Sequence, residues 1–150
     1  MLKELPPTVE AESLPARGLN FFSPEIWQGE TYCWSAPKAA VNLPKVSPGC
    51  CIRLDARPTG GWLARRPRLY LNGMRIPAEN VTETDGIVEV MIREDIFPKE
   101  GSAILSWDCV PFLPSESGLA DRRRLGVALI RATIEPRDAV MSTHNLERAA

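Results

Sequence analysis

The side chains of this sequence that could do chemistry are aromatic and charged, and their types indicate binding rather than catalysis. Four tryptophans are present, and a tryptophan ring can stack against the C–H face of a sugar. Trp34 and Trp107 alternate in phase with other apolar residues, which predicts that both are core residues. Trp62 lies in a glycine-containing loop flanked by arginines and is the better candidate for an exposed sugar platform. Trp27 lies among turn residues, and its role stays open.

A charged cluster, Asp121 followed by three arginines, stands at the end of a long predicted loop over 110–124. In a functional interpretation, the Asp121 carboxylate accepts sugar hydroxyls while the Arg123 guanidinium donates to ligand oxygens. In a structural interpretation, the same groups bind the backbone or each other and hold the loop in place. The structural interpretation is favoured, because an ordered loop needs fixed polar groups with or without a ligand. Long ordered loops nevertheless often carry function.

A second basic cluster, Arg65, Arg66 and Arg68, could bind an anionic sugar, a phosphate or a nucleic-acid backbone. A solvated surface is the favoured alternative. The whole chain has 18 basic and 19 acidic side chains and a formal net charge of −1, so it offers no long-range attraction to nucleic acid. We therefore expect no nucleic-acid partner.

Catalytic and metal-binding patterns are absent from the sequence. The one histidine, His144, lies near the C-terminal end, and neither G-x-S-x-G nor a glycine-rich phosphate loop occurs. Carboxylates such as Glu30, Asp108 and Asp121 could pair as in a glycoside hydrolase, or the two aspartates could bind structural calcium, but their spacing marks neither site. The four cysteines lack C-x-x-C spacing, so no zinc site is expected and the thiols should be reduced and buried. We expect neither an enzyme nor a cofactor.

The bulk properties predict one domain with a real core. The chain has 150 residues, and its 14 prolines and 10 glycines favour short strands over helices. No signal peptide and no run of membrane-spanning length is evident, which predicts a cytoplasmic protein without a membrane span. Composition predicts an N-terminal tail over 1–17, a folded domain over 18–136, and a C-terminal tail or short helix over 137–150.

Strand patterns recur through the predicted domain. The longest is in the stretch 121–136, where residues 128, 130, 132 and 134 form one apolar face. Other strands are expected at 30–35, at 39–43 (ended by Pro44), at 50–56 and at 68–72, where Asn72-Gly73 signals a type I′ hairpin. Further strands at 87–93 and 103–110 bring the total to about eight, at a spacing of roughly 8–12 residues. This pattern predicts an all-β fold, an antiparallel β-sandwich of jelly-roll (galactose-binding-like) type, with a partly open barrel as the second choice.

Four short motifs occur in a fixed order: YCWS at 32–35, LNG at 71–73, FLPS at 112–115 and DRRRLG at 121–126. In this order they resemble a β-sandwich module of bacterial glycosyltransferases and other surface-polysaccharide proteins, over roughly 18–136. The resemblance implies a carbohydrate-binding or accessory role, with a glycan or a glycosyltransferase-type protein as partner. No transferase domain is present here, so the chain is either an excised module or one that works alone.

Two hypotheses follow. The first is a non-catalytic carbohydrate-binding module tied to bacterial polysaccharide biosynthesis. Its predicted site residues are Trp62, Arg65, Asn72, Asp108, Asp121 and Arg123. The second is a structural module that docks onto another protein, or onto its own copies as a homo-oligomer, through an exposed sheet face.

Overall fold

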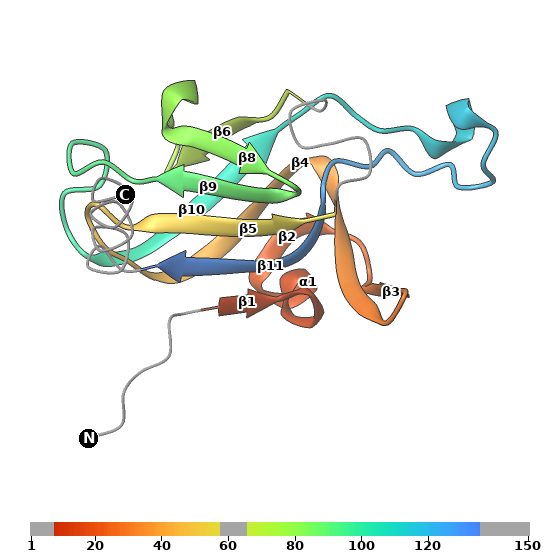
Figure 1. Ribbon diagram of the computed structural model, residues 1–150, viewed down its shortest axis with the longest axis horizontal. Coiled ribbons are helices and arrows are strands. Elements are labelled where there is room, and N and C mark those ends of the chain that lie inside the picture. The colour runs from red at the N-terminus through yellow and green to blue at the C-terminus, as the bar shows by residue number, and fades with distance from the viewer. Residues whose placement is uncertain (1–7, 58–65, 136–150) are drawn as a thin grey trace, which may run out of the picture.

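The computed structural model describes residues 8–57 and 66–135, which form an all-β fold (Figure 1). The strands are β1 (Thr8–Glu10), β2 (Gly18–Phe21), β3 (Glu25–Trp27), β4 (Glu30–Val46), β5 (Cys51–Ala56), β6 (Arg68–Leu71), β7 (Met74–Arg75), β8 (Val81–Thr84), β9 (Ile87–Met91), β10 (Gly101–Asp108) and β11 (Ala128–Glu135). The helical turns are η1 (Ala11–Ser13), α1 (Leu14–Arg17), η3 (Ala78–Asn80) and η4 (Pro114–Ser117). No helix within these residues is long and apolar enough to cross a membrane.

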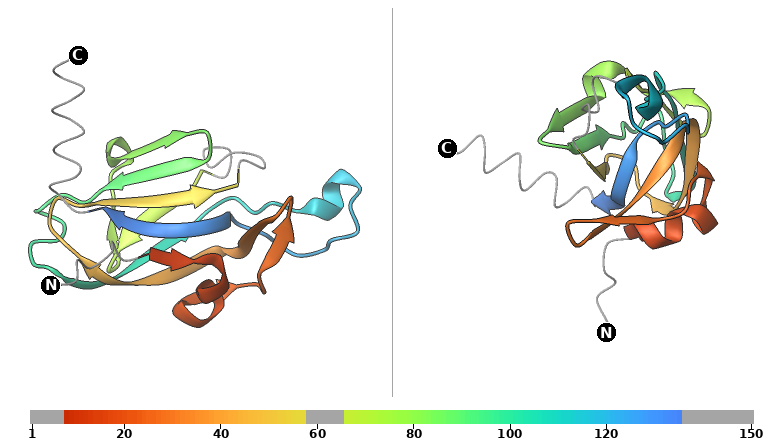
Figure 2. Two further views of the ribbon diagram at one scale, coloured as in Figure 1. Left: turned by 60° about the horizontal axis from the view of Figure 1, so that its bottom comes forward. Right: turned by 90° about the vertical axis from the view of Figure 1, so that its right-hand side faces the viewer.

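All strand pairs are antiparallel and belong to one curled sheet. Its order is β7-β6-β10-β4-β11-β5-β9-β8, with β1 added to β11, and with β2 and β3 added to β4. Viewed from the right-hand end, the green and blue strands β8, β9 and β11 lie opposite the orange strand β4 (Figure 2, right). The all-β prediction is confirmed, whereas the jelly-roll type remains a prediction.

Strand β4 generates the two layers of the curled sheet because it changes partner along its length. Near its start, Cys33 and Trp34 pair with β11, whereas from Lys38 onward it pairs with β10. β2 pairs with the other edge of β4, both near the segment of β4 that meets β11 and along the segment that meets β10. The sheet therefore divides at Ser35 into one layer of β11, β5, β9 and β8 and another of β10, β6 and β7.

The strands predicted at 30–35 and at 39–43, the second ending at Pro44, are parts of one strand of 17 residues, β4. Pro44 does not end it, because the ladder is already interrupted there: Leu43 pairs with Ala103, and the next pair is Val46 with Gly101. A proline at such a bulge leaves no ladder hydrogen bond unmade.

The final strand also contains a bulge, and this makes the predicted apolar face wrong. The register between β11 and β5 shifts between Leu129 and Arg131, so side chains change sides at Ile130. Leu129 and Ala132 consequently both face the main core, although they are three residues apart. Ala128 and Ile130 lie instead in a second, smaller cluster.

The domain begins earlier than composition suggested. Val9, Ala11 and Leu14 are buried and belong to the main core. Thr8–Glu10 pairs with β11 and covers its edge. The predicted tail is therefore wrong for residues 8–17, whose apolar side chains at positions 9, 11 and 14 were missed as a packing signal. The predicted C-terminal tail or helix lies outside the described residues.

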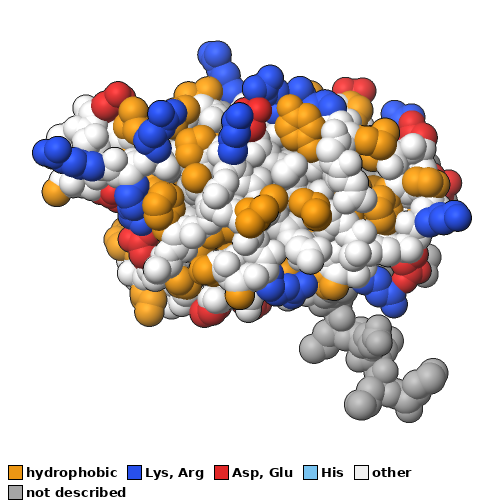
Figure 3. Space-filling model, turned by 180° about the vertical axis from the view of Figure 1, so that it is seen from behind, with side chains coloured by type: hydrophobic (Ala, Val, Ile, Leu, Met, Phe, Trp, Pro, Cys, Tyr) orange, Lys and Arg blue, Asp and Glu red, His pale blue; other side chains and the backbone are white. Residues whose placement is uncertain are grey.

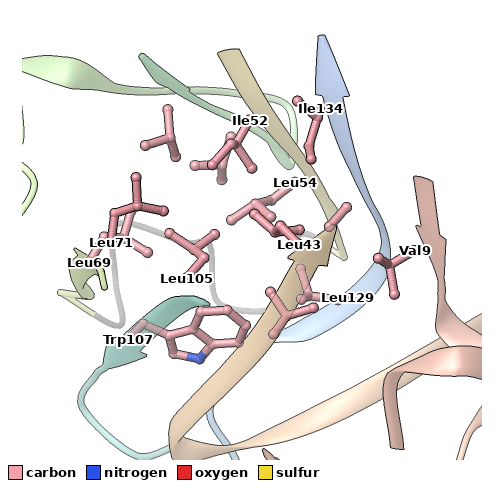
Figure 4. Packing of buried hydrophobic residues seen from close by; sticks show 14 of the residues in the cluster. Val9, Leu43, Ile52, Leu54, Leu69, Leu71, Leu105, Trp107, Leu129 and Ile134 are labelled. Atoms are coloured by element: carbon pink, nitrogen blue, oxygen red, sulfur yellow. The ribbon is translucent and has the colours of Figure 1, made fainter. Parts of the chain in front are cut away.

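The main core fills the space between the layers (Figure 4). Leu43, Leu54, Leu105 and Leu129 are almost completely buried there. Trp107 is 2% exposed and makes an edge-to-face contact with Phe21, with ring centroids 5.9 Å apart. The prediction that Trp34 and Trp107 are core residues is confirmed, Trp107 in this core and Trp34 in the second cluster.

The four cysteines are unbridged and buried, as expected. Burial raises the pKa of the Cys33 thiol to about 11, and the negative charge of Glu25 adds to the effect. Burial likewise raises the pKa of Cys51 to about 12. These thiols behave as small apolar groups rather than as nucleophiles.

Two-residue turns connect three of the hairpins: β3–β4, β6–β7 and, through Asp85 and Gly86, β8–β9. Asn72 and Gly73 have φ of 49° and 81°, which confirms the predicted type I′ turn between β6 and β7. Gln28 and Gly29, with φ of 52° and 78°, make an equivalent turn that the sequence analysis missed. They join β3 to β4 in a hairpin that carries Ile26 and Trp27. Both side chains are exposed.

Candidate functional site

The structure separates the predicted site residues into groups. Trp62 and Arg65 lie outside the described residues. Asn72 and Asp108 belong to the layer of β6 and β10, whereas Asp121 and Arg123 stand at the end of the molecule where the β3–β4 hairpin lies. Within the described part of the chain Asp108 binds Arg68 and Asp121 binds Arg123, so the two aspartates share no side-chain partner there.

Asn72 has a structural role. Its Oδ1 accepts a hydrogen bond from the backbone N–H of Ile104 (2.9 Å), and its own N–H donates to the Ile104 carbonyl (2.9 Å). With its positive φ, the residue fixes the β6–β7 turn against β10. Its amide is engaged there in holding the hairpin.

Asp121 and Arg123 hold the base of the arm, the long loop over 110–124 that projects from the body (Figure 1). The Asp121 carboxylate accepts from the Arg123 backbone N–H (2.9 Å), from Nε (3.0 Å) and from Nη2 (2.6 Å). Arg123 Nη1 donates to Glu25 Oε2 (3.1 Å), which ties the arm to β3. Hydrogen bonds from Arg123 lower the pKa of Asp121, and the same contact raises the pKa of Arg123 above its usual range. These contacts are those of the structural interpretation.

Aromatic residues support the arm from below. Trp34 stacks on Phe112, with centroids 5.8 Å apart, and meets Tyr32 edge-on at 6.5 Å. The Arg57 guanidinium lies between the rings of Trp27 (4.0 Å) and Tyr32 (4.7 Å). Trp27 is 51% exposed, so one exposed aromatic side chain stands on this hairpin.

A shallow hollow lies on the outer face of the other layer. The register places Leu19 beside Ala40, Ala40 beside Ser106, and Ser106 beside Tyr70. Directly paired residues on neighbouring strands share a face, so these four side chains form one row across β2, β4, β10 and β6. The two small side chains in the middle form a floor between the larger Leu19 and Tyr70. This hollow has a volume of about 340 Å³.

A charged row closes one end of the hollow. Lys38 is opposite Asp108 across the strands, and Asp108 is opposite Arg68. Arg68 Nη2 donates to both Asp108 oxygens, at 2.9 and 3.1 Å, and this bond raises the pKa of Arg68. The Lys38 ammonium has no ion-pair partner among the described residues. Asn20 lines the same end and donates from Nδ2 to the Lys38 carbonyl (3.0 Å).

The hollow thus combines an aromatic ring with charged and amide groups in one concavity. Figure 3 views the molecule from this side, and Lys and Arg side chains gather along its upper edge, over β6 and β7. Of the predicted site residues that the structure describes, Asp108 alone lines the hollow. Tyr70, Lys38 and Asn20 were missed, because only the sheet order and register bring them together.

No group of three or more His, Cys, Asp or Glu side chains in residues 8–57 and 66–135 could hold a metal ion. Comparisons with known proteins add no identity: no protein-family model matches the sequence, and no curated protein matches it either.

Proposed function

We propose that this chain is a non-catalytic carbohydrate-binding module that holds a sugar in the hollow between Leu19 and Tyr70. One observation carries the proposal: the half-buried ring of Tyr70 stands in a concavity beside a carboxylate and an ammonium group. Sugars need such a pairing, since their rings have apolar C–H faces and polar edges.

Each group in the hollow has a task in this proposal. The Tyr70 ring and Leu19 contact the apolar face of the sugar, while the small floor of Ala40 and Ser106 leaves room for it. The Asp108 carboxylate spends part of its acceptor capacity on Arg68, and its remaining lone pairs accept sugar hydroxyls. The Arg75 guanidinium, 5.9 Å from the centroid of Tyr70, helps to hold the ring in place.

The shape of the hollow limits the affinity. A ligand efficiency of about 0.3 kcal/mol per non-hydrogen atom gives a disaccharide of about 23 such atoms at most about −7 kcal/mol, a Kd near 10 µM. Because the hollow is open, part of the ligand remains in water, and we expect a Kd between about 10 µM and 1 mM.

The biological setting is part of the same proposal. The resemblance of the motifs to modules of bacterial glycosyltransferases supports an accessory role in polysaccharide biosynthesis in the cytoplasm. A jelly-roll arrangement of the two layers is compatible with the curled sheet and belongs to this proposal.

A glycan array followed by calorimetric titration of each hit tests the proposal. Tyr70→Ala should weaken binding roughly 5- to 30-fold, since it removes about 1–2 kcal/mol of ring contact. Ser106→Gln should also weaken it by filling the floor, and Trp27→Ala, on the β3–β4 hairpin and outside the lining of the hollow, is the matched control. Retention of full affinity by both hollow variants, with circular dichroism showing intact folds, would refute this site.

A protein-docking module is the second candidate, and a separate observation favours it. Ile26 is 74% exposed and Leu119 60%, on the β3–β4 hairpin and on the arm respectively. Isolated exposed apolar residues are common, so this candidate gains weight only if the glycan screen is silent. Sedimentation of the chain across a concentration range then tests association with its own copies.

A further inference from the structure

We infer that the hollow selects acidic sugars, those that carry a carboxylate or a phosphate, over neutral ones. This inference rests on the proposed function and adds the class of ligand to it. The observation behind it is an excess of cationic side chains around a single carboxylate.

Three cationic side chains lie at or beside the hollow, and Lys38 is the one among them that lines it. Arg75 pairs with Tyr70 in the register of β6 and β7, and Arg68 and Lys38 flank Asp108. Among the residues that the structure describes, Asp108 is the one acidic side chain lining the hollow. This local excess contrasts with the formal net charge of −1 for the whole chain.

The existing ion pair does not cancel the excess. Arg68 binds Asp108 through Nη2, and because the two groups carry opposite unit charges this pair is neutral as a unit. Lys38, directly across the strands, stands outside ion-pair distance of the same carboxylate. Its exposed ammonium is therefore available to an anionic group of a sugar that lies on Tyr70, and Arg75 stands on the opposite side of the ring.

The other conspicuous arginine on the molecule is differently placed. Arg123 is held between Asp121 and Glu25, so two carboxylates face one guanidinium. An anion gains little from the Arg123 guanidinium, because two carboxylates already accept its hydrogen bonds. Lys38, by contrast, has no such carboxylate partner among the described residues.

Matched pairs of sugars test the inference by calorimetry. Glucuronosyl-glucose is compared with cellobiose, and glucose 6-phosphate with glucose, at low and high salt. We expect at least one acidic member to bind about three- to tenfold more tightly than its neutral partner at 50 mM salt, and the advantage to shrink at 500 mM. The two pairs distinguish carboxylate from phosphate recognition.

Variants locate the effect. Lys38→Gln should weaken binding of the acidic sugar several-fold more than binding of the neutral sugar, and so remove most of the acidic preference. Lys45→Gln is the control, since Lys45 lies on the same strand but pairs with Glu100 (3.4 Å) away from the hollow. Equal affinity for acidic and neutral sugars overturns the inference and leaves the proposed function standing. Absence of binding by all four sugars and by every glycan on the array overturns both.

Discussion

Replacing Ser35 by alanine should destabilise the protein more than any other serine-to-alanine change, because this hydroxyl closes the point where the two layers divide. Ser35 is the one fully buried polar side chain in the described core. Its Oγ accepts from the Val127 backbone N–H (3.1 Å) and from Trp107 Nε1 (3.3 Å), and it donates to the Ala36 carbonyl (2.7 Å).

The magnitude follows from these bonds. A buried backbone N–H that loses its acceptor costs about 1–3 kcal/mol, and loss of the indole hydrogen bond adds roughly 1 kcal/mol. The sum, about 2–4 kcal/mol, is a large share of the 5–15 kcal/mol typical of a folded domain. For a chain of this size it corresponds to a fall in Tm of roughly 4–16 °C.

Urea unfolding measures this loss as a shift of the transition midpoint at constant m-value. The control is Ser102→Ala, an exposed serine on β10, which should change the unfolding free energy by less than about 0.5 kcal/mol. If Ser35→Ala lowered the unfolding free energy as little as this control, the reasoning about the division of the layers would be refuted.

Three further predictions concern the arm, the final strand and the thiols. Gly126→Ala should destabilise by at least about 2 kcal/mol in the same urea assay, because its new Cβ would lie 2.4 Å from a backbone oxygen; an unchanged midpoint contradicts this. Carboxyl NMR should find the pKa of Asp121 below the ordinary aspartate value in the native protein and near that value in Arg123→Gln. Because folding lowers the pKa of Asp121, its contact with Arg123 stabilises the native protein above the unfolded pKa near 4, and this stabilisation is lost as the pH falls through the folded pKa. Identical titration of Asp121 in the native protein and in Arg123→Gln would contradict the contact. Cys33 and Cys51, with pKa values of about 11 and 12, should react with a thiol reagent at pH 8 far more slowly in the native chain than in urea, and rapid native reaction would show that they are accessible.

Features set by neighbouring residues could be predicted from the sequence. Asn72-Gly73 favours positive φ at both positions, and the turn formed as expected. Trp34 and Trp107 alternate with apolar neighbours, and both are buried. A strand was expected at 50–56, and Arg53 and Asp55, two residues apart on it, form an ion pair (3.0 Å). These results depend only on short-range geometry.

Features set by pairing between distant segments could not be predicted. The bulge at Ile130 reverses the faces of β11, and nothing in the apolar pattern of that strand marks it. Pro44 suggested the end of a strand, yet β4 itself is bulged at this position, with one residue more than β10 between two paired positions, and the strand continues.

The hollow was missed for the same reason. Tyr70 and Lys38 are 32 positions apart in the sequence and meet only through the register of β10 with both neighbouring strands. Asp108 was identified as a candidate because it is a carboxylate, but its partner Arg68 was grouped with Arg65 and Arg66 in the second predicted basic cluster.

The central claim is that a sugar binds in the hollow, and NMR mapping of an array-positive glycan on the isotope-labelled chain tests it most directly. We predict that saturable shift changes will centre on the backbone amides of Asn20, Lys38, Tyr70 and Ser106, while those of Trp27 and Arg57 remain unmoved. Changes centred on Trp27 and Arg57 instead, or no saturable change at millimolar glycan, would contradict the account.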